Sequence, residues 1–246
     1  NASAVEHVLK FRVLGSPGDQ IQLRIGTASV GTQIVNDVSF SVGYHCYAFT
    51  ATAADFYVQF KHAAGKTLQI DDVSLIDNSG VEVDSPYATA NLFDINGPQS
   101  ADVLFLFHSS YAPYKLSRLG HTSWSLIEVE WLDGPYMTTN ATATTLTPSA
   151  TTGKGITITA SAVTGINDGL GFKTTDVGRL VRIDNPAAGS DFGYARIVGW
   201  TSTTVVTADV KRAFATTNAD DVWRLGAWSD TTGWPRTGVL HEQRLV

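Results

Sequence analysis

The feature that most constrains the fold of this chain is a two-residue period of apolar side chains. The stretches Leu9 to Val13 and Val103 to Phe107 both alternate in this way. A period of two places alternate side chains on the same face of a strand. Thr is abundant and aromatic residues make up 10% of the chain, and both types favour strands. The pattern therefore predicts an all-β protein.

Residues 1–80 are predicted to form a β-sandwich of about six strands. Ser16 to Asp19 should form its first turn, because each residue there favours turns. A bulge or turn is expected at Asn36-Asp37, and a bulge at Asp71-Asp72 would bring Val73 and Leu75 to the inward face. The expected strands are Leu9–Val13, Ile21–Ile25, Gln33–Phe40, Tyr44–Thr50, Phe56–Lys61 and Leu68–Leu75.

Residues 81–139, continued by 222–246, are predicted to form a second unit. After a connection with a short strand at Val81 to Asp84, three strands should form an antiparallel meander. The first of these strands is apolar on both sides, which indicates burial of both faces. A turn is expected at Ser109 to Pro113, because Pro113 fixes its own φ. Three strands within about 30 residues match most of a β-propeller blade, whose repeats span roughly 40 to 50 residues.

Residues 140–221 are predicted to form an inserted small β-barrel domain. The loop Gly165 to Gly171 superficially resembles a calcium loop, but it lacks the alternating ligands of one, which favours a turn. Asn140-Ala141-Thr142 is formally a glycosylation sequon. Gly238 to Val246 should begin a further strand, so we expect the 246 residues to be a piece of a longer chain. The strands expected in the inserted domain are Ile156–Ala160, Gly178–Ile183, Gly193–Trp200 and Thr204–Val210, after which Val222–Ala227 should return to the propeller-like unit.

Two runs of sequence carry a resemblance to a known family. ADVLFLFHSSYAPYKLSRLGHTSWSLIEVEWLDGPY, which begins at Ala101, and WRLGAWSDTTGWPRTGVLHEQRLV, which begins at Trp223, resemble the tail nozzle, or packaged-DNA stabilisation, proteins of short-tailed bacteriophages. The resemblance covers residues 81–246. It implies a non-enzymatic virion protein, a conduit for DNA ejection that assembles with other tail proteins as a hexameric ring. If Trp200, Trp228 and Trp234 are exposed, we expect them at ring contacts, since aromatic residues are enriched at interfaces; the alternative is that all three fill cores.

The first region carries a different resemblance. The strand IDDVSL, Ile70 to Leu75, is similar to the closing strand of jelly-roll carbohydrate-binding modules. This resemblance implies a jelly-roll-like sandwich and a structural calcium ion held by Asp71 or Asp72, because carboxylate oxygens are ligands that calcium requires. The alternative is that both residues are simply acidic side chains at a strand bulge.

The same resemblance suggests attachment to a surface glycan as an alternative function. Tyr44, Tyr47 and Tyr57 are of the type that forms flat sugar platforms, and His45 would add a polar contact. Tyr at alternating strand positions is also typical of ordinary sheet packing. The sequence leaves both interpretations open.

Charge and composition disfavour several other functions. The formal net charge is −6, and Lys and Arg are scattered, whereas a nucleic-acid-binding domain typically carries a basic patch. The one cysteine, Cys46, is predicted to be a small core residue. No catalytic motif is recognisable, and Glu128 and Glu130, spaced like a carboxylate pair on one strand face, match a half-exposed strand equally well. We therefore expect no enzymatic activity and no membrane span.

Overall fold

The computed structural model describes residues 5–16, 18–62, 68–77, 81–184, 192–242 and 244–245. It is 52% strand and 5% helical, which confirms the all-β prediction. None of its described helices is long and apolar enough to cross a membrane. The chain divides into two compact units, which are described separately. The sandwich unit comprises Asn1–His108, Pro113–Glu130 and Arg236–Val246, and the half-barrel unit comprises Ser109–Ala112 and Trp131–Pro235.

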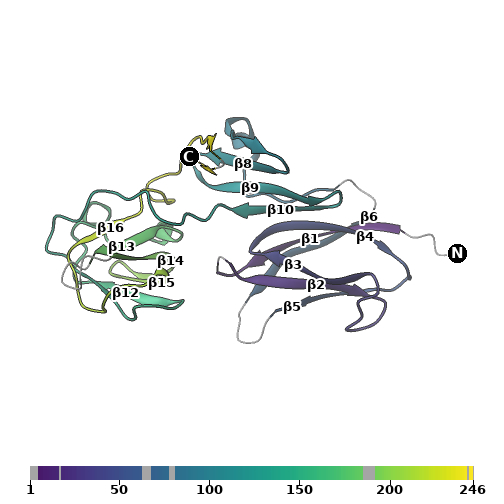
Figure 1. Cartoon of the computed structure of the whole chain (residues 1–246), viewed down its shortest axis with the longest axis horizontal. Coiled ribbons are helices and arrows are strands. Elements are labelled where there is room, and N and C mark those ends of the chain that lie inside the picture. The colour runs from purple at the N-terminus through teal and green to yellow at the C-terminus, as the bar shows by residue number, and fades with distance from the viewer. Residues whose placement is uncertain are drawn as a thin grey trace. The chain divides into compact units, whose positions relative to one another are not determined.

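Two sheets face each other in the sandwich unit (Figure 1). The smaller sheet has the strand order β3-β2-β5, and the larger one begins with β6-β1-β4. All of these pairings are antiparallel. The six strands are β1 Val5–Leu14, β2 Gln20–Gly26, β3 Val35–Ser41, β4 Gly43–Ala51, β5 Tyr57–Lys61 and β6 Gln69–Asp77. Each strand predicted in this region is therefore present, with ends shifted by a few residues.

The sandwich core lies between these two sheets and follows the alternation in the sequence. Every second side chain of β1 and of β2 is buried in one shared cluster. Its members from these two strands are Leu9, Phe11, Val13, Ile21, Leu23 and Ile25. Phe11 meets Phe40 edge to face, with ring centroids 5.1 Å apart. Burying each such side chain contributes about 1.5 to 3 kcal/mol. Because β5 alternates too, its inward residues, Val58 and Phe60, pack on this cluster as predicted.

Two bulges interrupt the sandwich strands where the sequence predicts them. Pairing shifts by one residue in β3 opposite Leu23 to Ile25, and Asp37 there has φ 48°. A second shift occurs in β6 opposite Lys10 to Arg12, and Asp72 there has φ 50°. Asp is among the residues that tolerate this left-handed conformation best. Both bulges are confirmed. Leu75 pairs with the core residue Leu9 and so lies on the inward face, as predicted. Because β6 is an edge strand, Val73 and Leu75 are nevertheless 53% and 45% exposed.

The predicted meander is present but is part of the larger sandwich sheet. It consists of β8 Val103–His108, β9 Tyr111–Gly120 and β10 Ser123–Glu128, with the two-residue strand β7 Gln99–Ser100 at its end. β10 pairs with β4, so the full order is β6-β1-β4-β10-β9-β8-β7 (Figure 1). No separate blade is formed by the described residues, because this pairing makes the meander a continuation of the sandwich.

Several local expectations around the meander differ from the structure. The chain turns at residues 109–110, and Pro113 lies inside β9, where its carbonyl accepts a 2.7 Å hydrogen bond from Val129 N. Of the residues in β8, only Phe107 and His108 are fully buried. Residues 81–84 form no strand, and the connection instead contains the 3₁₀ turn η1 Thr89–Asp94. Ser16 and Asp19 are joined by a turn hydrogen bond of 3.0 Å, whereas Pro17 and the predicted turn at 78–80 lie outside the described residues.

The C-terminal segment returns to the sandwich unit. Gly238 lies so close to the ring of Phe107 that an added Cβ would sit 2.4 Å from its Cζ. The segment then forms the two-stranded ribbon β17 Leu240–His241 and β18 Arg244–Leu245. The prediction of one continuous strand from Gly238 was wrong, because the chain reverses at Glu242, which has φ 46°.

The half-barrel unit contains one curled six-stranded antiparallel sheet (Figure 1). Its order is β11-β12-β15-β14-β13-β16, and its concave side holds a core that includes Ile158, Val181 and Ile197. The four strands predicted here are present with small shifts. β16 pairs with β13, so this strand belongs to the curled sheet and not to the propeller-like unit. The strands are β11 Leu146–Pro148, β12 Ile156–Ala160, β13 Leu180–Asp184, β14 Phe192–Ser202, β15 Val205–Arg212 and β16 Trp223–Leu225.

Candidate binding pocket

The three tyrosines of the predicted glycan platform lie on different surfaces of the sandwich unit. Tyr47 packs against the core, edge to face with Phe40 at 6.0 Å between ring centroids. Tyr44 lies three positions earlier on the same strand and therefore faces the opposite side. There the Arg12 guanidinium stacks 4.7 Å from the centroid of its ring. Tyr57 is exposed on β5 of the other sheet. The fold brings none of these three rings together as a shared platform.

His45, proposed as an additional polar contact for a sugar, is buried in the sandwich core. Its ring lies 5.4 Å from that of Phe11 and 5.1 Å from that of Phe40, between centroids. Nε2 is 2.6 Å from the Ser41 carbonyl oxygen, whereas Nδ1 has no hydrogen-bond partner among the described residues. Burial lowers the pKa of His45 to about 4, so the ring is neutral near pH 7. His45 is thus a core residue and does not reach a surface ligand.

Asp71 and Asp72, the residues implied for calcium, are exposed at the β6 bulge. The Asp71 carboxylate accepts a 2.9 Å hydrogen bond from Asp72 N, a local contact of the bulge itself. Within the ranges that the structure describes, no three His, Cys, Asp or Glu side chains gather as metal ligands would. Cys46 is fully buried, as predicted.

The other residues considered from sequence have mainly local roles. Glu128 ends β10 and Glu130 lies beyond it, so they do not share a strand face. Trp234 is buried and donates from Nε1 to Asp230 at 2.6 Å. Trp228 packs on Trp131, with ring centroids 4.5 Å apart. Of the three tryptophans proposed for ring contacts, Trp200 is the exposed one, at 41%.

A pocket of about 390 Å³ opens in the half-barrel unit. Its wall includes the segment 137–142, the loop residues Gly165, Asn167 and Asp168, and Thr231 and Thr232. Lys173, Arg179, Trp223 and Leu225 complete the lining. The volume falls within the range of roughly 300 to 1,000 Å³ that is typical of small-molecule sites.

A buried ion pair lies beneath the pocket. Arg179 Nη1 donates to Asp176 Oδ1 at 2.9 Å, and the two side chains are 1% and 0% exposed. Asp176 ends the 3₁₀ turn η3 Thr174–Asp176, and its other oxygen accepts 2.8 Å and 2.7 Å hydrogen bonds from Lys173 N and Asn167 Nδ2. Burial lowers the pKa of Arg179, and the Asp176 carboxylate opposes that shift. A buried charge needs such a partner, because desolvating it alone costs several kcal/mol.

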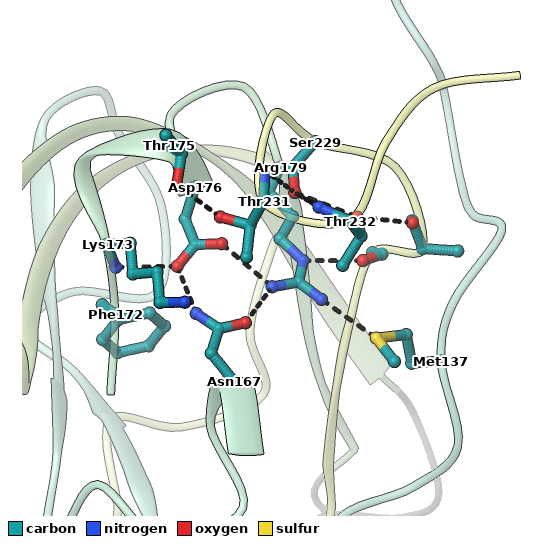
Figure 2. A network of polar contacts seen from close by, with 12 residues as sticks. Met137, Asn167, Phe172, Lys173, Thr175, Asp176, Arg179, Ser229, Thr231 and Thr232 are labelled. Carbon is teal, nitrogen blue, oxygen red and sulfur yellow. Dashed lines mark hydrogen bonds and ion pairs between the residues drawn. The ribbon is translucent and has the colours of Figure 1, made fainter. Parts of the chain in front are cut away.

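Asn167 joins this pair to the pocket wall (Figure 2). Its Oδ1 accepts from Arg179 Nη1 at 2.7 Å, and its Nδ2 also donates to the Gly171 carbonyl at 3.0 Å. Asn167 and Asp168 have φ of 48° and 57°, and both lie in the 3₁₀ turn η2 Asn167–Gly169. Asn and Asp tolerate this left-handed region better than most residues. The loop Gly165 to Gly171 is thus a turn, as predicted, and its asparagine also anchors the ion pair.

The remaining contacts of Arg179 reach across the half-barrel unit. Nε donates to the Gly226 carbonyl at 2.7 Å, and Nη2 donates to Met137 Sδ at 3.0 Å (Figure 2). A thioether sulfur is a weak acceptor. Sequence patterns singled out neither Asp176 nor Arg179. An Asp and an Arg three positions apart are also common on exposed surfaces, so their spacing alone does not indicate a buried ion pair. The left-handed Asn-Asp-Gly triplet was the one local signal that could have drawn attention to this site.

Asn140, the sequon asparagine, supports the rim of the pocket. Nδ2 donates to the carbonyls of Thr142, Thr144 and Asp221, at 3.0, 3.0 and 2.9 Å. Oδ1 accepts from the backbone and the hydroxyl of Thr142, at 3.0 and 2.8 Å. The amide is therefore fully engaged in holding the segment 140–144 in place.

Comparison of the chain with protein-family models and with curated protein sequences finds no match.

Proposed function

We propose that this chain is a non-enzymatic structural component of a bacteriophage tail, a part of the nozzle through which DNA leaves the virion. The observation that carries the proposal is that the two runs resembling nozzle proteins, which are separated by residues 137–222, contact each other. Runs that lie far apart in sequence and still contact each other are what a single family motif split by an insertion would produce.

The two runs contact each other both in the half-barrel unit and in the sandwich unit. In the half-barrel unit, Trp234 N donates to the Ser109 carbonyl at 3.1 Å and Ala227 N to the Pro135 carbonyl at 2.9 Å. The Trp131 and Trp228 rings meet in the same unit. In the sandwich unit, Gly238 packs on Phe107. Pro135 and Ala227 lie on either side of the intervening domain, residues 140–221.

The proposal includes assembly with other tail proteins and a hexameric ring. A closed ring repeats one surface patch against a different one. Trp200 is a candidate for such a patch, because it is exposed and its Nε1 is already bonded to the Phe172 carbonyl at 2.9 Å, which holds the ring in one orientation. An aromatic side chain fixed in this way loses little entropy on association.

The test is the composition of purified virions of the phage whose genome encodes the chain. Peptides from the chain should be found by mass spectrometry after the particles are banded on a density gradient. Antibodies raised against the chain should label the tail end of intact particles in electron micrographs. Virions that contain no such peptides, with the capsid and portal proteins detected in the same sample, would refute the proposal.

A further inference from the structure

The pocket in the half-barrel unit contains polar groups that the described residues leave without partners. A guanidinium group has five N–H donors. Four of those on Arg179 are directed to Gly226, Asn167, Asp176 and Met137, so one N–H of Nη2 has no acceptor among the described residues. Another of the five reaches only the sulfur of Met137. A side chain that is 1% exposed and lines a cavity with an unused donor indicates an absent acceptor.

Four further side chains lining the pocket have uncommitted polar groups. The Lys173 ammonium, the Asp168 carboxylate and the hydroxyls of Thr138 and Thr139 make no hydrogen bond with the part of the chain that the structure describes. By contrast, the hydroxyls of Thr142 and Thr232 are bonded within the chain. The open groups thus include two cationic donors, one anionic acceptor and two hydroxyls that both donate and accept.

The charges of the lining select the class of ligand. Asp176 balances Arg179, and Asp168 balances Lys173, so the pocket has no net formal charge. An anion placed there would face the Asp168 carboxylate with that of Asp176 buried behind Arg179, and a cation would face a guanidinium and an ammonium group. A hydroxyl suits the set, since it donates to Asp168 and accepts from Lys173 or Arg179. The apolar side chains of Leu225 and Met137 offer contact to C–H groups.

We propose that this pocket binds a neutral saccharide, one sugar residue at a time, through Asp168, Lys173 and Arg179. A sugar hydroxyl oxygen replaces the sulfur of Met137 at Nη2 of Arg179. Met137 is 47% exposed and unbranched, so it moves aside at little cost. The site is in a different unit from Tyr44, Tyr47 and Tyr57. The proposal does not depend on the proposed function as a phage tail component.

The test is a titration of the isotope-labelled full chain, followed by amide NMR, with glucose, galactose, mannose and N-acetylglucosamine, and with glucuronate as the anionic comparison. At least one neutral sugar should shift the amides of Thr138, Thr139 and Asp168 saturably, with a dissociation constant in the millimolar range. Asp168→Asn and Lys173→Met should each weaken binding about tenfold, the value of one hydrogen bond to a charged group. The matched controls Asp221→Asn, Lys154→Met and Tyr57→Ala should bind like the original chain.

Three results would overturn the proposal. The first is the absence of saturable shifts with all four neutral sugars, and the second is binding that persists unchanged in both pocket variants. The third is tighter binding of glucuronate than of glucose, which would make the pocket an anion site. Each variant's amide spectrum also shows whether it is folded. If one variant is unfolded, Thr139→Val takes its place; it exchanges a hydroxyl group for a methyl group and should weaken binding as well.

Discussion

The ring of His45 is held 2.6 Å from the Ser41 carbonyl at the centre of the sandwich core. Because burial lowers its pKa from 6.5 to about 4, the folded chain keeps this histidine neutral while the unfolded chain takes up a proton. Its contribution to stability is therefore fully present above about pH 6.5 and is lost as the pH falls toward 4.

The first prediction follows from that difference. Between pH 6.5 and 5, the free energy of unfolding should fall by about 1 kcal/mol per pH unit on account of His45 alone. His45→Phe should lack this part of the pH dependence, whereas His241→Gln, at an exposed position, should keep it. Urea unfolding at several pH values measures both. An equal acid slope in the original chain and in His45→Phe would contradict the prediction.

Arg179→Met is expected to destabilise the half-barrel unit by about 3 to 5 kcal/mol, because it leaves the fully buried Asp176 carboxylate without its partner. Adding Asp176→Leu should cost much less than the sum of the two single changes, since no charge is then left buried alone. Denaturant unfolding of the two single variants and the double variant measures this coupling. Additive costs would show that the two side chains do not act as a pair.

Asp72→Gly should leave stability unchanged or raise it slightly, because Gly adopts φ 50° without a steric cost. Asp72→Val should cost about 1 to 2 kcal/mol, since a β-branched residue is strained there. Asp55→Val is the control at an exposed position outside the left-handed region. Thermal melts of the three variants decide the matter: similar losses for both valine variants would mean that the bulge conformation has no influence.

Asn140→Ala should destabilise the chain by about 2 kcal/mol or more, because three carbonyls lose the hydrogen bonds that Nδ2 donates to them. Asn218→Ala, at an exposed site, should change stability by less than about 0.5 kcal/mol. The comparison is again made by denaturant unfolding. If the two variants were equally stable, the rim of the pocket would not depend on this amide.

Sequence patterns predicted the strands and both bulges because these depend on neighbours along the chain. The change of parity between Ile70 and Val73 is visible in the sequence, and the structure resolves it with one extra residue in β6. The assignment of strands to sheets was less predictable. No local signal shows that β10 pairs with β4 or that β16 pairs with β13, because both pairings join residues far apart in sequence.

The pocket was missed for a related reason. Its ligating groups come from segments near residues 138, 168, 173 and 179, which only the curled sheet brings together. The tyrosines show the opposite error, since sequence patterns suggested a sugar platform that the fold does not form. Their residue type favoured a sugar platform, but the strand period places Tyr44 and Tyr47 on opposite faces of β4, and Tyr57 belongs to the other sheet.

The pairing of β10 with β4 also has a consequence for synthesis of the chain. β1 and β4 can pair as soon as the first 51 residues have left the ribosome. The other edge of β4 is covered only by β10, which begins about 70 residues later. At translation rates of roughly 5 to 20 residues per second, that edge stays open for roughly 4 to 14 seconds. During this interval, a second nascent chain on the same messenger RNA could pair with it, so close spacing of ribosomes should favour aggregation of this protein.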